Sequence, residues 1–203
     1  MNNVSRLLLV FALAGAWAGG AAAEDELARG ARLAKERCAK CHGVDGLGVS
    51  PDYPSIAGQN RDYFVKQIFN FKTGLRYNEP MDPVIEKLLA ADIRALSLHY
   101  ASIPPGSVPS NDQALLAEGR TIYLDGIPKK GVYSCAVCHG VEAEGGAQMP
   151  RLAGQNPVYL EKQMRGFIQK TRQNDRLMHL TLAAMTAREL KAVAVYLGNE
   201  KIN

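Results

Sequence analysis

Apolar residues recur along this chain at the spacing of helices that are buried on one face. Phe64, Ile68 and Phe71 follow an i, i+4, i+7 pattern in a segment that begins near residue 60. A matching segment begins near residue 156. No stretch shows the alternation of apolar and polar residues that is typical of a strand. We therefore predict an all-α protein, with further helices over residues 27–37, 91–101, 114–123 and 186–197.

The two sets of helices belong to an internal repeat. Residues 150–156 (PRLAGQN) match residues 54–60 (PSIAGQN) at an offset of 96, and matches continue through the following helix. Such self-similarity indicates a duplicated structural unit. Proline, glycine and serine are concentrated between the halves, as in a linker. We therefore predict two domains, residues 24–103 and 113–203, joined by a linker at residues 104–112.

The four cysteines of the chain fall in two copies of one motif, Cys-x-x-Cys-His-Gly. On a helix, residues three and four positions apart share a face, so both sulfurs and the imidazole of each copy point to one side. This spacing is the attachment pattern of c-type haem, held by two thioether bonds with the histidine on the iron. The sequence predicts two covalent haem c groups, at Cys38, Cys41 and His42 and at Cys135, Cys138 and His139.

Other uses of paired cysteines fit the sequence less well. A redox-active Cys-x-x-Cys pair needs neither the following histidine nor a duplicate. A zinc ribbon has its cysteine pairs about 15–20 residues apart, whereas Cys38 and Cys135 are 97 positions apart. A zinc-binding interaction module stays as an alternative that the mass of the intact chain would test.

The first 23 residues have the features of a secretory signal peptide. Arg6 precedes an apolar run at residues 7–18, and alanines at 21–23 precede an acidic stretch. We expect residues 1–23 to be cleaved on export to the periplasm, because bacteria attach haem to this motif outside the inner membrane. An uncleaved membrane anchor is the alternative, although the apolar run is short for crossing a bilayer.

The formal net charge is +4, of which Arg6 in the predicted signal contributes one. Residues 24–108 hold 11 basic and 11 acidic residues and residues 109–203 hold 12 and 9, so neither half is basic enough to indicate nucleic-acid binding. The second half carries an eight-residue insertion that includes Lys129 and Lys130. These lysines either dock an acidic partner or belong to an ordinary loop.

The sixth ligand of each iron is expected at equivalent positions in the two halves. Met81 and Met178 are equivalent, because each lies eleven residues before the aligned acidic residue of the last helix. No other methionine recurs in this way, and neither do the remaining histidines, His99 and His179. Methionine opposite histidine raises the reduction potential and leaves no open position on the iron. We therefore predict Met81 and Met178 as axial ligands, and an electron carrier rather than an enzyme.

Further repeated residues are expected beside the haems. Pro54 and Pro150 follow the motif histidines by 12 and 11 residues. Their carbonyls are predicted to accept hydrogen bonds from the imidazoles. Four other repeated polar residues either meet haem propionates or occupy a solvated surface: Gln59, Gln155, Arg76 and Arg172.

Together these motifs resemble the diheme cytochrome c4 family. The resemblance rests on the two haem motifs, on the repeated Pro-x-(Ile/Leu)-Ala-Gly-Gln segment, and on the arginines that precede each methionine, and it covers essentially the whole mature chain. It implies two tandem class I cytochrome c domains related by a pseudo-twofold axis, with haems that meet across the interdomain face. It also implies the iron ligands His42, Met81, His139 and Met178.

The resemblance implies a periplasmic carrier that passes electrons from a quinol-oxidising complex or a dehydrogenase to a terminal oxidase or reductase. Its partners would be redox proteins, with transient contact to membrane complexes. A dedicated diheme cytochrome subunit of a larger oxidoreductase, such as a flavocytochrome sulfide dehydrogenase, is the alternative. A diheme peroxidase would need an iron with an open position, which the paired methionines disfavour.

Overall fold

Helices and loops make up the described part of the chain, residues 25–201 of a computed structural model. Within that range there are no β-strands, only isolated bridges between Ile127 and Val132 and between Gly146 and Met149. The all-α prediction is confirmed. The predicted signal peptide, residues 1–23, lies outside the described range. No helix among the described residues is long and apolar enough to cross a membrane.

The N-terminal half begins with a helix that leads directly into the first haem motif. Asp25 caps this helix by accepting a hydrogen bond from the Leu27 N–H at 3.4 Å. The predicted helix at residues 27–37 is present, but its last turn before Cys38 has π-helical geometry. The helices of this half are α1 (Glu26–Leu33), the π-helical η1 (Ala34–Cys38), α2 (Ala39–His42), α3 (Arg61–Lys72), α4 (Asp82–Glu86) and α5 (Ala90–Ser102).

The C-terminal half repeats this order, with the insertion as the main difference. The insertion forms a short 3-10 helix between α6 and the second haem motif. The sequence pattern did not predict the short helices beside the two methionines, α4 and α9. The helices of this half are α6 (Gln113–Asp125), η2 (Pro128–Lys130), α7 (Ala136–His139), α8 (Pro157–Ile168), α9 (Arg176–Leu182) and α10 (Ala187–Asn199).

The first and last long helices of each half cross at a glycine. A Cβ atom on Gly30 of α1 would overlap the carbonyl oxygen of Ala95 in α5. A Cβ atom on Gly119 of α6 would overlap the carbonyl oxygen of Ala192 in α10. The two glycines recur in the sequence because each one lets two helix backbones touch.

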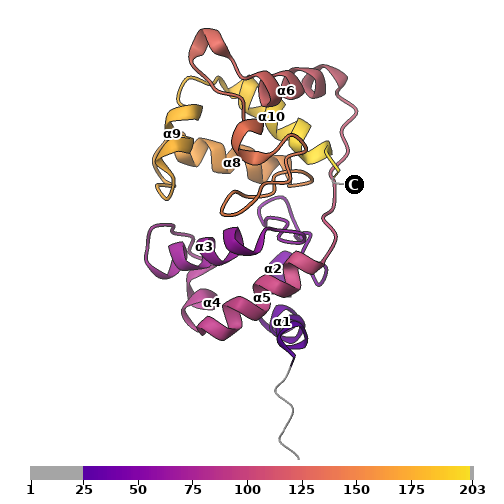
Figure 1. The fold of residues 1–203 in the computed structure, drawn as a ribbon, viewed down its shortest axis with the longest axis vertical. Coiled ribbons are helices and arrows are strands. Elements are labelled where there is room, and N and C mark those ends of the chain that lie inside the picture. The colour runs from indigo at the N-terminus through magenta and orange to yellow at the C-terminus, as the bar shows by residue number, and fades with distance from the viewer. Residues whose placement is uncertain (1–24, 202–203) are drawn as a thin grey trace, which may run out of the picture.

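Each half has its own core. Leu96 and Tyr100 of α5 are 1% exposed and Val193 and Leu197 of α10 are 2% exposed, as the helical pattern predicts. The buried apolar residues form two clusters with no member in common. Figure 1 shows the two halves stacked along the long axis of the molecule. The segment that connects α5 to α6 runs along one side.

Candidate haem-binding sites

One cavity of about 1100 Å³ is lined by residues of both halves. Its walls include apolar side chains from both cores, such as Phe64, Ile68, Leu160 and Phe167. A flat apolar macrocycle with one polar edge suits a cavity of this kind. All eight site residues predicted from the sequence line it: Cys38, Cys41, His42, Met81, Cys135, Cys138, His139 and Met178.

The two motif histidines are buried and oriented by a backbone carbonyl. His42 Nδ1 lies 3.0 Å from the carbonyl oxygen of Pro54, and His139 Nδ1 lies 3.4 Å from that of Pro150. Both predicted proline contacts are confirmed. Burial lowers the pKa of both imidazoles, and the bond to the proline carbonyl opposes this in part. Since a carbonyl only accepts, Nδ1 carries the proton and each neutral ring keeps its Nε2 lone pair for a metal.

The two predicted methionine ligands pack against the core of their own half. Met81 immediately precedes α4 and contacts the N-terminal cluster. Met178 lies in the first turn of α9, where its N–H donates to Asp175 Oδ1 at 3.1 Å. Met149, Met164 and Met185 also line the cavity. Their aligned counterparts are Tyr53, Ile68 and Leu88, so only Met81 and Met178 offer sulfur at equivalent positions.

The cysteine environments differ from those of redox or zinc sites. Burial raises the pKa of Cys38, and it raises the pKa of Cys135 to about 11. A redox-active cysteine needs a lowered pKa instead. Across residues 25–201, no group of three or more His, Cys, Asp or Glu side chains is placed to hold a metal ion.

Arg76 and Arg172 meet between the two halves, against the haem cavity. Arg76 donates to Gln67 Oε1 at 2.8 Å and to Gln163 Oε1 at 3.1 Å, and Arg172 donates to the same two oxygens at 3.3 and 2.8 Å. Each guanidinium also lies over a phenylalanine ring of its own half. Because these glutamine partners are neutral, they do not balance the charge of the two neighbouring guanidinium groups, and the carboxylates of a haem fit such a site.

Arg151 links the two halves beside the haem cavity, which the sequence pattern did not predict. It is 1% exposed, and its guanidinium crosses to the other half, donating to the carbonyls of Ala57 at 2.7 Å and Gly58 at 3.1 Å. The aligned residue in the first half is Ser55, whose hydroxyl is buried without a partner. The sequence contains one indication of this difference, because Arg151 is the only charged residue by which PRLAGQN differs from PSIAGQN.

The inserted loop is tied to its own half. Lys130 Nζ lies 2.7 Å from Glu189 Oε1, and the Glu189 side chain also accepts the N–H of Thr186 at the start of α10. The insertion can be interpreted either as a docking site or as an ordinary loop, and the contact of Lys130 with Glu189 supports the ordinary loop. Lys129 is exposed on the surface of this loop.

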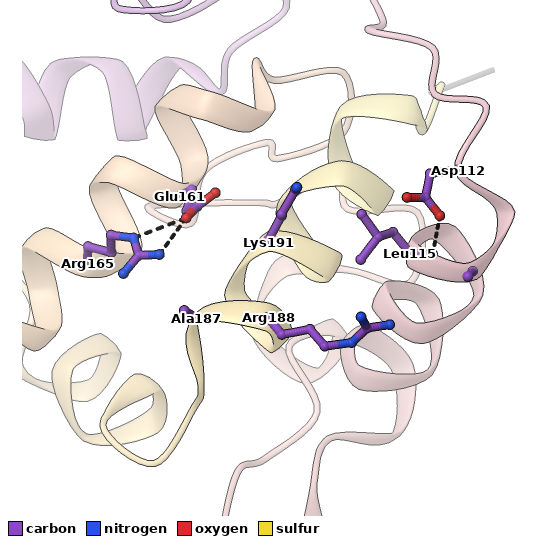
Figure 2. Close-up of a pocket in the computed structure, with 8 residues that line it drawn as sticks. Asp112, Leu115, Glu161, Arg165, Ala187, Arg188 and Lys191 are labelled. Carbon is purple, nitrogen blue, oxygen red and sulfur yellow. Dashed lines mark hydrogen bonds and ion pairs between the residues drawn. The ribbon is translucent and has the colours of Figure 1, made fainter.

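A second, smaller cavity of about 490 Å³ is lined by residues of α6, α8 and α10 in the C-terminal half (Figure 2). Its charges are largely paired within the protein, since Arg165 lies 2.6 Å from Glu161 and Arg188 lies 2.8 Å from Glu118. No residue of the haem motifs and neither repeated methionine lines it. It is therefore not part of the haem site.

The fold and the site together define a c-type cytochrome with two tandem class I domains. The Cytochrome c family model matches residues 27–96 and 116–200. "Cytochrome c4" of Thiocapsa roseopersicina is 35% identical over 167 residues, which cover 79% of this chain and 85% of the relative. The chain belongs to the diheme cytochrome c4 family. It is an electron-transfer protein with two covalent haem c groups, and it is not an enzyme.

Further relatives and solved structures agree with this assignment. The crystal structure of reduced recombinant cytochrome c4 from Pseudomonas stutzeri matches with a TM-score of 0.79 and 29% identity, covering 88% of this chain and all of that chain. "Thiosulfate dehydrogenase electron acceptor" of Thiomonas intermedia (strain K12) is 34% identical over 82% of this chain and 79% of the relative. The chain is thus a diheme electron carrier whose partners are redox proteins.

Proposed function

We propose that this chain is a periplasmic carrier in which His42 and Met81 bind one haem iron, and His139 and Met178 bind the other. Cys38 and Cys41 anchor the first haem, and Cys135 and Cys138 anchor the second. When bound, each haem supplies a one-electron couple of its iron. The observation that carries the proposal is that both predicted ligand sets line one shared cavity between the halves.

The protein residues have distinct roles in this proposal. Each histidine presents a neutral imidazole whose orientation its proline carbonyl fixes. Each methionine offers a soft, neutral sulfur that raises the reduction potential and completes the iron coordination. Arg76 and Arg172 provide the positive charge for the propionates of both haems. The two haems would then meet where the two halves meet.

The proposed donor is a dehydrogenase or a quinol-oxidising complex, and the proposed acceptor is a terminal oxidase or reductase. The relatives named as electron acceptors of thiosulfate dehydrogenase support a dehydrogenase as donor. Export with cleavage of residues 1–23 would bring the mature chain to the periplasm, where such partners lie. Transient contact with membrane complexes follows from a quinol-linked donor or an oxidase acceptor.

A dedicated subunit of a larger oxidoreductase is the second candidate. The structure of thiosulfate dehydrogenase (TsdBA) from Marichromatium purpuratum matches with a TM-score of 0.77 and 32% identity, covering 85% of this chain but only 40% of that chain. A chain of that design joins a portion similar to this protein to a further part. Purification from the native source separates the candidates, since a subunit would co-purify with a catalytic chain.

The proposal is tested on protein expressed with the bacterial haem-attachment machinery. The intact mass should equal the chain from residue 24 plus two haems, and the oxidised protein should show two low-spin His/Met centres. Stopped-flow mixing with a purified dehydrogenase, and separately with a terminal oxidase, should show rapid reduction and rapid reoxidation. A haem-free mass, or a high-spin centre in the wild-type protein, would refute the ligand assignment.

A further inference from the structure

Two glutamine side chains form reciprocal pairs with the backbone of the opposite half. Gln155 Oε1 accepts the N–H of Ser55 at 2.8 Å, and Gln155 Nε2 donates to the carbonyl of Ser55 at 2.7 Å. Gln59 forms the same pair with Arg151, at 2.8 and 3.2 Å. All four residues are buried, with exposed fractions of 1–6%, so water does not compete for these bonds. The solvated alternative for Gln59 and Gln155 is therefore wrong.

Each glutamine holds the peptide group that orients a haem histidine. The Ser55 N–H and the Pro54 carbonyl belong to one peptide group, and that carbonyl accepts from His42 at 3.0 Å. The Arg151 N–H and the Pro150 carbonyl form the matching peptide group, 3.4 Å from His139 Nδ1. A continuous chain of hydrogen bonds therefore runs from each motif histidine through one peptide group to a glutamine of the other half.

Hydrogen bonds in such a chain polarise one another. A peptide group whose N–H donates to a good acceptor carries more negative charge on its carbonyl oxygen, so that oxygen accepts more strongly. A stronger bond to Nδ1–H makes the imidazole a more electron-rich ligand. An electron-rich ligand favours Fe(III) over Fe(II) and lowers the reduction potential of its haem.

We propose that Gln155 tunes the haem of the N-terminal half through His42, and that Gln59 tunes the haem of the C-terminal half through His139. Both are positioning residues, since neither contacts a histidine directly. The inference rests on the proposed function, because it requires both histidines to be iron ligands. Each domain would thus influence the reduction potential of the haem in the other domain.

The test measures the two histidine Nδ1–H resonances and the two haem potentials in the diheme holoprotein. Proton NMR of the reduced, diamagnetic protein reports the strength of each Nδ1–H bond. Gln155→Met removes the acceptor for the Ser55 N–H at nearly constant side-chain length. The His42 resonance should then move upfield and the potential of the N-terminal haem should rise, while the His139 resonance stays in place. Gln59→Met should give the mirror result.

Two further variants serve as rescue and control. Gln155→Glu keeps an oxygen acceptor for Ser55 N–H, so the His42 resonance should stay at or downfield of its wild-type position even if the methionine variant does not fold. Gln169→Met changes an exposed glutamine at the end of α8 and should leave both resonances and both potentials unchanged.

The crossed pattern is what separates tuning from a general loosening of the interface. Equal shifts at both haems in Gln155→Met, or a shift confined to His139, would overturn the inference, as would an upfield His42 resonance in Gln155→Glu. Failure of the proposed function would be visible earlier, because the wild-type protein would then lack two iron-bound imidazole signals.

Discussion

Arg76 in the N-terminal half donates a hydrogen bond to the phenol oxygen of Tyr159 in the C-terminal half, at 2.7 Å. The aligned pair repeats the contact in the opposite direction, because Arg172 donates to Tyr63 at 3.1 Å. The duplicated sequence therefore meets itself as two subunits do in a symmetric dimer, with the same residues used on both sides. The same type of contact therefore occurs twice across the interface.

Removing the phenol hydroxyl should destabilise the contact between the halves. Tyr159→Phe leaves one donor of a charged guanidinium without its partner, and hydrogen bonds to charged groups contribute about 1.5–3 kcal/mol. The free energy of unfolding of the holoprotein in denaturant should fall by roughly that amount. A double-mutant cycle with Arg76→Met should give a coupling energy, whereas Tyr133→Phe, at a residue 77% exposed, should have little effect. A zero coupling energy would show that the bond does not hold the halves together.

Loss of one methionine sulfur should change one haem and spare the other. In Met81→Ala the N-terminal haem should become high-spin and its reduction potential should fall, because the neutral soft ligand that favours Fe(II) has been removed. Met178→Ala should do the same to the C-terminal haem. Absorption spectra and redox titration should each show one altered and one unaltered centre. Met149→Leu is the control and should keep both low-spin centres; a variant at 81 or 178 that also kept both would contradict the assignment.

The acid stability of the protein should depend on two capping carboxylates at the start of α5 and α10. Asp92 Oδ2 accepts the N–H of Leu89 at 2.9 Å, and Glu189 Oε2 accepts that of Thr186 at 2.7 Å. The backbone bond and Arg29 lower the pKa of Asp92, and Lys130 and the Thr186 N–H lower the pKa of Glu189. Their stabilisation is therefore full above the ordinary carboxyl pKa of about 4 and is lost as the pH falls through the lowered values.

Asp92→Asn tests this pH dependence. The variant should lose about 1–2 kcal/mol of unfolding free energy at pH 7, and its stability should then change less than that of the wild type between pH 4 and pH 2.5. Denaturant unfolding at several pH values measures both effects. Glu79→Gln, at an exposed loop position, should follow the wild-type curve. A variant that parallels the wild type at every pH would exclude a role for this cap.

Features set by neighbouring residues could be predicted from the sequence. The helical pattern around Phe64 and Ile68 predicts α3, and both residues are buried in it. The contact between each motif histidine and a proline carbonyl could be predicted because the two residues are only 12 and 11 positions apart in the sequence. The short helices α4 and α9 escaped prediction because stretches of five and seven residues carry too little periodic signal.

Contacts between the halves could not be predicted in the same way. Repeat alignment shows that Gln59 matches Gln155, but equivalence does not say that each binds the backbone of the other half. Arg151 donates to Gly58, 93 positions earlier, and no local pattern links two such residues. These bonds depend on how two domains are oriented, which is a property of matching surfaces and not of either helix pattern. The predicted domain boundaries and the cleavage site stay predictions.

The helix crossing at Gly30 and Gly119 should tolerate no side chain. Alanine at either position would place a methyl group against a backbone carbonyl of the last helix, where no flexible side chain can move aside. Overpacking of this kind costs typically 1–3 kcal/mol, and here it outweighs the better helix propensity of alanine, which is worth about 1 kcal/mol.

Gly30→Ala should therefore lower the unfolding midpoint of the N-terminal domain, and Gly119→Ala should lower that of the C-terminal domain. The absorbance of the haem in each domain measures its unfolding. Gly146→Ala meets open space and should leave both midpoints in place. Stabilisation by Gly30→Ala would mean that α1 and α5 lie further apart than their backbones do here.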